Sequence, residues 1–359
     1  MRYVPSNCLR PGQKLATDLK FNDNRIFLRN EVVLTEKLIG RIRSIGFQGL
    51  YIDDDISKDI TVANIVSDEL MHKAKTEIKS LFLVAEKPWQ NKKAIIHLRT
   101  IRWVINEMVD EIQRNRKTMI NIVDLRTFDD YTFSHSLNVA VLSVVVGTVM
   151  RLDRQMLQDL AMGSLIHDIG KIFIDKNIIN KNGKLTPEEY GEVKQHSQRG
   201  YDYLLKTYNG LSDNAMKAVL EHHEQYNGEG YPNGLAGEDI HLFGRIICVA
   251  DVYDALTSDR PYRRAMLPSD AVEYIMGGFN RMFDPQVVNA FIKKVAPYPV
   301  GTIVRLSNGI EGIVVENFES SGMRPRIQIL EDGKQTKEYI DLKNDKDTLN
   351  LTVKEVIRM

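Results

Sequence analysis

Residues 157–168, which read LQDLAMGSLIHD, have the spacing of a helix that packs against a core on one side. The positions that would share one helical face are Leu157, Leu160, Ala161, Ser164, Leu165 and Asp168. Intervals of three and four residues predict an amphipathic helix with Asp168 on its buried side. Because a buried carboxylate is costly unless it is paired, we expect another part of the chain to supply a partner for Asp168.

The region around this stretch, from about residue 121 to 295, is also predicted to be helical. Thr186-Pro187-Glu188-Glu189 is a capping box with proline at the first helical position, which predicts a helix over residues 187–205. Asp284-Pro285 predicts another helix, which continues to about residue 295. The middle of the chain is therefore expected to be a helical bundle.

The N-terminal part has a different pattern. In residues 1–55, short strands are predicted at 25–28, 32–34 and 49–52, around one helix at 35–44. Asn22-Asp23-Asn24 is a turn signal, and Gly46 is the predicted stop of the helix. Residues 56–120 form a predicted helical linker, because apolar positions recur at helical spacing over about 61–116.

The C-terminal part, residues 298–359, reads as a small all-β domain. Strands at 303–306 and 310–315 flank Asn308-Gly309, for which a tight turn is expected. Strands at 327–330 and 339–342 flank Asp332-Gly333. The predicted fold class is therefore mainly α, with a small α+β N-terminal module and a small β domain. The predicted domain boundaries are 1–55, 56–120, 121–297 and 298–359.

Composition and charge narrow the class of protein. Lys plus Arg number 48 and Asp plus Glu number 48, so the formal net charge is zero, which argues against DNA binding through bulk positive charge. Cys8 and Cys248 lie in no metal-binding spacing and favour a reducing compartment. Residues 139–150 are too short for a membrane span, which needs about 20 residues. We expect a cytoplasmic protein, with no DNA partner and no signal peptide.

Five of the eight histidines, between positions 135 and 223, define the candidate site: His135, His167, His196, His222 and His223. A single histidine or aspartate in a helix is most often a surface residue or a satisfied core hydrogen bond. His167-Asp168 and Asp251, however, lie in apolar stretches, where an unpaired charge is costly. Imidazoles and carboxylates that converge from several helices are suitable ligands for transition metals. Adjacent histidines diverge by about 100° on a helix, so the pair at 222–223 reaches one ion only if the helix ends there.

A family resemblance rests on motifs in a fixed order. They are Tyr131-Thr132-Phe133-Ser134-His135-Ser136, His167-Asp168-Ile169-Gly170-Lys171, His196, His222-His223, Gly230-Tyr231-Pro232 and the run from Val249-Ala250-Asp251 to Arg260-Pro261-Tyr262-Arg263. Over roughly half of the chain, these motifs resemble the HD-GYP family of helical phosphohydrolases, which degrade the bacterial second messenger cyclic di-GMP. The resemblance implies a helical HD-domain bundle in the middle of the chain.

The resemblance also implies seven metal ligands: His135, His167, Asp168, His196, His222, His223 and Asp251. It assigns His135, His167 and Asp251 to one ion and the three other histidines to a second ion, with Asp168 as the bridge. Some family members hold a third metal through a glutamate four residues before the first histidine. That position is Tyr131 here, so we expect a binuclear site, with iron or manganese favoured and zinc or nickel allowed by the same ligands.

The residues implied to contact the substrate are Lys171, Tyr231, Pro232, Arg260 and Arg263. Asp168 and Lys171 are the implied catalytic residues, and Lys171 either binds the phosphate or helps to protonate the leaving 3′ oxygen. The two arginines suit phosphates and the guanine edge. Asp254 either orients a ligand or satisfies a neighbouring hydrogen bond, and the sequence leaves both roles open.

The implied activity is hydrolysis of cyclic di-GMP to linear pGpG, with GMP as a further product. Two divalent ions carry four positive charges, of which Asp168 and Asp251 cancel two. The surplus favours a phosphodiester and a metal-bridging hydroxide that attacks phosphorus in line. Two alternatives stay open: another cyclic dinucleotide such as cyclic GMP-AMP as substrate, and a non-catalytic sensor or scaffold. The expected partners are cyclic di-GMP, a second copy in a homodimer, and a signalling protein.

Overall fold

The structure is a computed structural model that describes residues 1–21, 25–45, 47, 49–86, 91–120, 131–181, 183–208, 210–258 and 265–357, without the side chains of 91–98, 131 and 132. The chain divides into two compact units. Met1–Asn64, Lys117–Asp129 and Ile292–Met359 form the first unit, and Ile65–Arg116 with Asp130–Phe291 form the second. The predicted class is confirmed: the chain is mainly helical, with a small N-terminal sheet module and a C-terminal antiparallel sheet.

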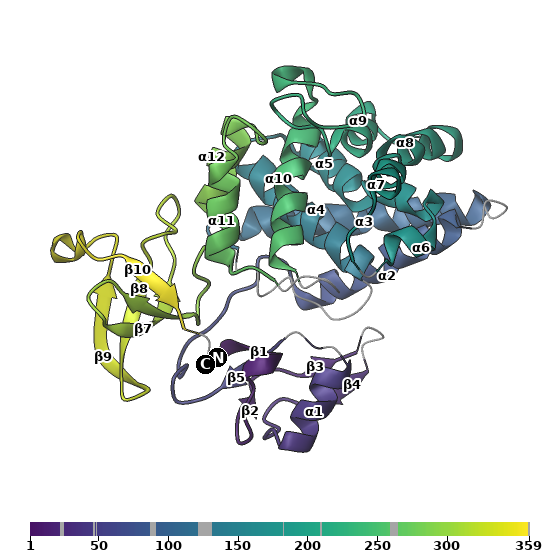
Figure 1. Cartoon of the computed structure of the whole chain (residues 1–359). Helices are drawn as coiled ribbons and strands as arrows, with labels where there is room; N and C mark the ends of the chain where they lie inside the picture. Colours follow the sequence, from purple (N-terminus) through teal and green to yellow (C-terminus); the bar gives the residue numbers. More distant parts are fainter. Residues whose placement is uncertain are drawn as a thin grey trace. The chain divides into compact units, whose positions relative to one another are not determined.

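The second unit is a helical bundle (Figure 1). Its helices are α2 (Asp68–Ala85), α3 (Asn91–Arg114), α4 (Tyr131–Val149), α5 (Arg154–Ile166), α6 (Lys176–Ile179), α7 (Pro187–Lys194), α8 (His196–Thr207), α9 (Asp213–Glu221), α10 (Leu242–Thr257), α11 (Pro268–Gly277) and the start of α12 (Pro285–Lys294). Helix α4 packs against α5 and α10, and α9 packs against both α5 and α10. Residues 134–147 of α4 are all buried, so this helix is central to the bundle.

Several helices begin where the sequence predicts. The capping box is confirmed, because Thr186 Oγ1 accepts the Glu189 N–H at 3.2 Å and the Glu189 carboxylate accepts the Thr186 N–H at 2.7 Å. The Asp284 carboxylate accepts the N–H of Gln286 at 2.6 Å, where α12 begins. Side-chain caps of this kind satisfy N–H groups that have no partner within the helix.

The single helix predicted for residues 187–205 is wrong, because α7 and α8 are separate and meet at Gln195. The Gln195 N–H bonds to the carbonyl three residues before it, at 3.1 Å, which tightens the turn and ends α7. Helix α8 then lies against the 3₁₀ turn Ile169–Phe173. A Cβ at Gly170 would lie 1.8 Å from the His196 carbonyl oxygen, so only glycine fits this contact.

The helical pattern predicted from residue 61 begins later in the structure. Residues 61–67 are not helical, and α2 starts after Ser67. The Glu111 carboxylate of α3 accepts both the main-chain N–H and the hydroxyl of Ser67, at 2.6 and 2.8 Å. This tertiary contact takes the Ser67 N–H away from a further helical turn. Helices α2 and α3 pack on each other, and α3 packs on α5; the four domain boundaries stay predictions.

The N-terminal part of the first unit is a small sheet with one helix. Its elements are β1 (Arg2–Pro5), β2 (Lys14–Leu15), β3 (Leu19–Lys20), β4 (Ile26–Leu28), α1 (Glu36–Ile45) and β5 (Gly49–Asp53), with strand order β1-β5-β2 and a separate β3-β4 pair. The strand predicted at 32–34 is wrong, since Val33 forms only an isolated bridge to Lys14. The predicted turn at 22–24 and the stop at Gly46 lie outside the described residues.

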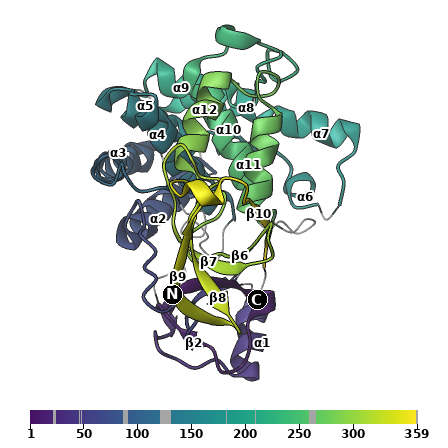
Figure 2. The same ribbon diagram turned by 90° about the vertical axis from the view of Figure 1, so that its left-hand side faces the viewer.

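The C-terminal part of this unit is a five-stranded antiparallel sheet of order β10-β6-β7-β8-β9 (Figure 2). Its strands are β6 (Ile303–Leu306), β7 (Glu311–Glu316), β8 (Arg326–Glu331), β9 (Lys334–Asp341) and β10 (Val353–Val356). The tight two-residue turn is at Asp332-Gly333, where both φ angles are positive, and not at Asn308-Gly309. Asn308 instead accepts the Ile310 N–H through its side chain, at 3.2 Å, which makes a longer loop.

None of the described helices is both long and apolar enough to cross a bilayer.

Candidate metal centre

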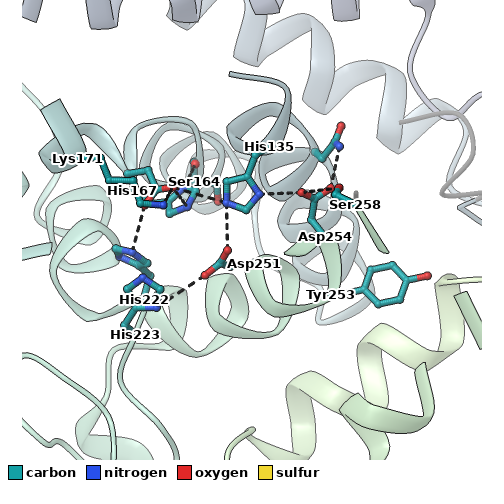
Figure 3. A network of polar contacts seen from close by, with 12 residues as sticks. His135, Ser164, His167, Lys171, His222, His223, Asp251, Tyr253, Asp254 and Ser258 are labelled. Atoms are coloured by element: carbon teal, nitrogen blue, oxygen red, sulfur yellow. Dashed lines mark hydrogen bonds and ion pairs between the residues drawn. The ribbon is translucent and has the colours of Figure 1, made fainter. Parts of the chain in front are cut away.

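The seven predicted ligands come from five parts of the helical unit and meet in its interior. His135 is on α4, His167 and Asp168 follow α5, His196 begins α8, His222 and His223 follow α9, and Asp251 is on α10. Figure 3 shows His135, His167, His222, His223 and Asp251 pointing toward one another. One possible ligand atom from each residue places them in two groups, and the atoms within each group lie within 4.8 Å of one another. The groups are Asp168 with His196, His222 and His223, and His135 with His167 and Asp251.

Asp168 belongs to the first group and also faces the second, and it is 1% exposed. Its Oδ1 is 3.3 Å from His196 Nε2 and 4.0 Å from His222 Nε2. Its Oδ2 is 3.4 Å from His167 Nε2 and 3.7 Å from His135 Nε2. The residue is buried as expected, but it is not on the predicted helix, because α5 ends at Ile166. The turn after α5 directs one carboxylate oxygen toward each group.

Three of the imidazoles are oriented by the ends of helices. His167, His196 and His222 each follow a helix end, and each Nδ1 donates to the carbonyl three residues earlier. The distances are 2.7 Å for His167 to Ser164, 2.7 Å for His196 to Val193 and 2.8 Å for His222 to Val219. The last carbonyls of a helix have no partner within it, so they are available for this role. With the proton on Nδ1, Nε2 is left as a lone pair that faces the centre.

This arrangement leaves electron pairs facing each other inside the protein. His196 Nε2 and His222 Nε2 are 3.2 Å apart, and neither carries a proton when Nδ1 is the donor. Among the described residues, His167 Nε2 and Asp168 Oδ1 are buried without a hydrogen-bond partner. Cations at the two groups would satisfy these atoms, and imidazole with carboxylate is a donor set that divalent transition metals prefer. The residues therefore fit a metal site.

His135 is oriented by a carboxylate rather than by a carbonyl. Its Nδ1 is 2.7 Å from Asp254 Oδ2, and its Nε2 is 3.1 Å from Asp251 Oδ1. Asn138 donates to the other oxygen of Asp254 at 2.8 Å and fixes that carboxylate. Of the two roles left open for Asp254, the geometry gives it a direct contact with a predicted ligand.

The charge states of the imidazoles differ within the centre. Burial disfavours a charged His135, but Asp251 and Asp254 outweigh burial and raise the pKa of His135 to about 10. Burial, together with the neighbouring imidazoles, lowers the pKa of His222 well below its ordinary value and that of His223 to about 3. Burial opposes ionisation of Asp168, yet Lys171 and the imidazoles hold the pKa of Asp168 well below its ordinary value.

Lys171 and Tyr231 lie against this cluster. Lys171 Nζ donates to Asp168 Oδ2 at 2.5 Å, and its side chain is 32% exposed, so the ammonium is open to a ligand. The Tyr231 ring stacks on the His223 ring, with centroids 4.7 Å apart and an angle of 30° between planes. The Tyr231 N–H donates to the His223 carbonyl at 3.1 Å. Both residues therefore border the candidate centre.

Two buried glutamates hold the backbone around His222-His223, and sequence reasoning missed both. The Glu224 carboxylate accepts the N–H groups of Asn233 and Leu235, at 2.7 and 3.1 Å. The Glu221 carboxylate accepts the His241 N–H at 2.7 Å, just before α10. An apolar helix face that ends in two glutamates was the available signal. Pro232 lies in the loop that Glu224 holds, and its peptide bond with Tyr231 is cis.

Some predicted residues cannot be placed. Arg260 and Arg263 lie outside the described residues, as does the side chain of Tyr131. Their predicted roles stay predictions.

Comparison with known proteins gives a family and several relatives. Residues 110–287 match the family model described as HD domain. A cyclic di-GMP phosphodiesterase of Pseudomonas aeruginosa is 40% identical over 228 residues, which cover 62% of this chain and 55% of that protein. The cyclic di-GMP phosphodiesterase response regulator RpfG of Xanthomonas campestris pv. campestris is 35% identical over 182 residues, covering 50% and 48%.

A relative with another named substrate also matches. The 3′3′-cGAMP-specific phosphodiesterase 1 of Vibrio cholerae is 35% identical over 191 residues, which cover 53% of this chain and 43% of that protein. The chain spans about half the length of these curated relatives.

Proposed function

We propose, from the premise that this chain belongs to the HD domain family, that it is a metal-dependent phosphodiesterase that hydrolyses cyclic di-GMP. The observation that carries the proposal is the Asp168 carboxylate, whose two oxygens face two separate groups of buried imidazoles. Relatives that are named cyclic di-GMP phosphodiesterases support the choice of substrate. We propose linear pGpG as the product, with GMP as a further product.

We propose two divalent transition-metal ions as cofactors. His135, His167 and Asp251 would hold one ion, His196, His222 and His223 would hold the other, and Asp168 would contact both. Iron or manganese is favoured, and zinc or nickel suits the same donors. Metal ions bound there supply Lewis-acid polarisation of a phosphoryl oxygen and a water nucleophile near neutral pH.

The protein's own residues orient these ligands and the substrate. Asp254 fixes the ring of His135 through Nδ1, so that Nε2 points to the centre. The Lys171 ammonium, with one donor on Asp168, has further donors for a phosphate oxygen or for the leaving 3′ oxygen. Tyr231 covers His223 and, with Pro232, forms one wall of the substrate site. Arg260 and Arg263 remain the proposed nucleotide contacts.

A second candidate substrate is 3′3′-cyclic GMP-AMP. The relative from Vibrio cholerae that is named for this substrate supports it. Both cyclic dinucleotides present phosphodiesters of the same charge, so the metal ligands alone do not discriminate between them. A non-catalytic sensor is the remaining alternative, and it is an outcome of the experiment below.

The test is a product analysis with a defined metal content. Protein purified without oxygen is analysed for its elements, then incubated separately with cyclic di-GMP and 3′3′-cyclic GMP-AMP, and the products are separated by chromatography. We expect pGpG from cyclic di-GMP at the higher rate, and no product from Asp168→Ala. A higher rate on cyclic GMP-AMP would favour the second candidate. Nucleotide binding without turnover by the metal-loaded protein would establish the sensor.

We also propose that the protein forms a homodimer, that it binds a signalling protein, and that it is located in the cytoplasm. Light scattering on the intact chain, and on a variant truncated after Pro297, tests the dimer and the part that the β domain plays in it.

A further inference from the structure

The end of α7 carries a lysine that none of the proposed roles uses. Lys194 is in the last turn of α7, two residues before His196. The neighbouring Val193 carbonyl accepts the hydrogen bond of His196 Nδ1 at 2.7 Å. The position of this helix end is therefore tied to the candidate metal centre.

Two tyrosine rings hold the ammonium group of Lys194. Its Nζ is 4.7 Å from the centroid of the Tyr190 ring and 5.6 Å from that of the Tyr231 ring. Tyr231 in turn stacks on His223 at 4.7 Å. Cation–π attraction at such distances restricts a side chain that would otherwise be mobile, which lowers the entropic cost of binding a ligand there.

Among the described residues, the ammonium group of Lys194 has no acidic partner. In the part of the chain that the structure describes, no carboxylate lies within ion-pair distance of Lys194. Other lysines of this region are paired: Lys171 with Asp168, Lys181 with Glu189 and Lys217 with Glu221. Lys194 is half-buried, and Tyr190 is 49% exposed, so solvent and ligands reach this group.

The proposed substrate, a cyclic dinucleotide, has a second phosphate that a second cationic side chain could bind. It carries two phosphodiesters, and only one of them can lie at Asp168 beside Lys171. The other phosphate is held in the same ring and keeps its negative charge during hydrolysis of the first. A lysine ammonium is a compact point charge that suits phosphate oxygens.

We propose that Lys194, held by Tyr190 and Tyr231, binds the second phosphate of the cyclic dinucleotide, the one that does not react. This inference rests on the proposed function, because it needs a substrate with two phosphodiesters. Lys194 is then a binding residue that contributes to the choice of substrate, while Lys171 acts at the reacting phosphate.

The test compares a ligand with two phosphates against a ligand with one. Lys194→Met keeps the length of the side chain and removes the charge, and Lys194→Arg restores a charge. We expect Lys194→Met to raise the KM for cyclic di-GMP about 10- to 100-fold, the range for loss of a hydrogen bond to a charged group. The kcat and the metal content should change less than about 3-fold, and Lys194→Arg should recover most of the KM.

The dinucleotide GpG, which carries both guanines but one phosphodiester, separates phosphate from base. As a competitive inhibitor, GpG should have the same inhibition constant with wild type and Lys194→Met. Tyr190→Leu, which removes one of the two rings, should raise the KM for cyclic di-GMP by a smaller factor. The matched control is Lys206→Met, an exposed lysine at the end of α8, which should change nothing.

Some results would overturn the assignment of Lys194. They are an unchanged KM in Lys194→Met, an equal weakening of GpG, or a loss of bound metal that accounts for the whole effect. Failure of wild type to hydrolyse cyclic di-GMP is a different result and rejects the proposed function. In that case, calorimetric titration of the same variants with cyclic di-GMP and GpG still decides whether Lys194 binds the second phosphate.

Discussion

Two sides of the candidate centre are held in different ways. On the α4–α10 side, defined as His135, Asp251 and Asp254, carboxylates contact both nitrogens of the imidazole. On the helix-end side, defined as His196, His222 and His223, main-chain carbonyls of Val193 and Val219 orient two of the three rings.

This difference changes what each side needs in order to be stable. Carboxylates raise the pKa of His135 to about 10, so a proton can balance the α4–α10 side when no metal is bound. On the helix-end side, burial and neighbouring rings lower the pKa values of His222 and His223, which favours their neutral forms. The facing lone pairs of His196 and His222 would be satisfied by a cation. The proposed metal ion would therefore meet little competition from protons at His222 and His223, whereas at His135 metal and proton would compete for the same nitrogen.

The largest effect is expected where the two sides share a residue. Asp168→Asn removes the negative charge of the carboxylate whose two oxygens face the two groups of ligands. We expect metal to be lost from both sides and turnover to fall at least about 1,000-fold, which is about 4 kcal/mol of transition-state stabilisation. Elemental analysis and steady-state kinetics measure this, with Asp159→Asn on α5 as the control. Loss of one metal only, with the other retained in full, would contradict a shared carboxylate.

A smaller effect should be confined to the α4–α10 side. Asp254→Asn removes the carboxylate behind His135, and such partners are worth about 10- to 100-fold in metal affinity. We expect this loss for one of the two ions, with the other unchanged, in a titration with a competing chelator. On the helix-end side, the rings of His196 and His222 are oriented by main-chain carbonyls, which a side-chain substitution does not remove. An equal loss of both ions would show that the two sides are not independent.

The pH dependence of the metal-free protein should have opposite signs on the two sides. The His135 pKa is raised from 6.5 to about 10, so its contribution is complete below pH 6.5 and is lost as pH rises through 10. The His223 pKa is lowered to about 3, so its contribution is present above pH 6.5 and is lost as pH falls through 3. Each slope is at most about 1.4 kcal/mol per pH unit.

Urea unfolding with a chelator present measures these slopes. His135→Gln should flatten the loss of stability between pH of about 7 and 9, and His223→Gln should flatten the loss between about 4 and 6. The slopes, and not the absolute stabilities, are the observables, since both variants lose contacts. If His135→Gln alters the acidic limb instead, the proposed charge state of the α4–α10 side is wrong.

The smallest effect is expected from the ring that covers the helix-end side. Tyr231→Leu removes the ring that stacks on His223, an interaction of about 0.5–1.5 kcal/mol. We expect the affinity of one ion to fall by less than about 10-fold, and the other ion to be unaffected. Tyr274→Leu on α11, where the ring is exposed, is the control. If Tyr231→Leu lowers the affinity for an ion more than Asp254→Asn does, the expected order of the two effects is wrong.

Local signals predicted much of the fold. The capping box at Thr186 and the Asp-Pro start of α12 were identified correctly, because their hydrogen bonds join residues two or three positions apart. The prediction of a tight turn at Asn308-Gly309 was wrong, because the Asn308 side chain accepts a hydrogen bond from the Ile310 N–H instead. The break at Gln195 was not predicted; just after it, the His196 carbonyl packs closely against Gly170, a contact between residues that are distant in the sequence.

The candidate site was predicted in the same uneven way. The types and order of its histidines and aspartates indicated a metal centre, and the family resemblance grouped them. Glu221 and Glu224 were missed because their partners are main-chain N–H groups up to 20 positions away; the sequence places both glutamates beside an apolar helix face but does not identify those N–H groups.

The sequence by itself determined which donor atoms this protein has, and where most helices begin, since these depend on residues close together in the chain. It also implied that Asp168 would be buried and would need a partner. Only the tertiary structure decided which atoms meet. Contacts such as that of His135 with Asp254, 119 positions apart, depend on the packing of α4 against α10. Where each helix ends decides which carbonyl is free, and that carbonyl decides which imidazole nitrogen faces the centre.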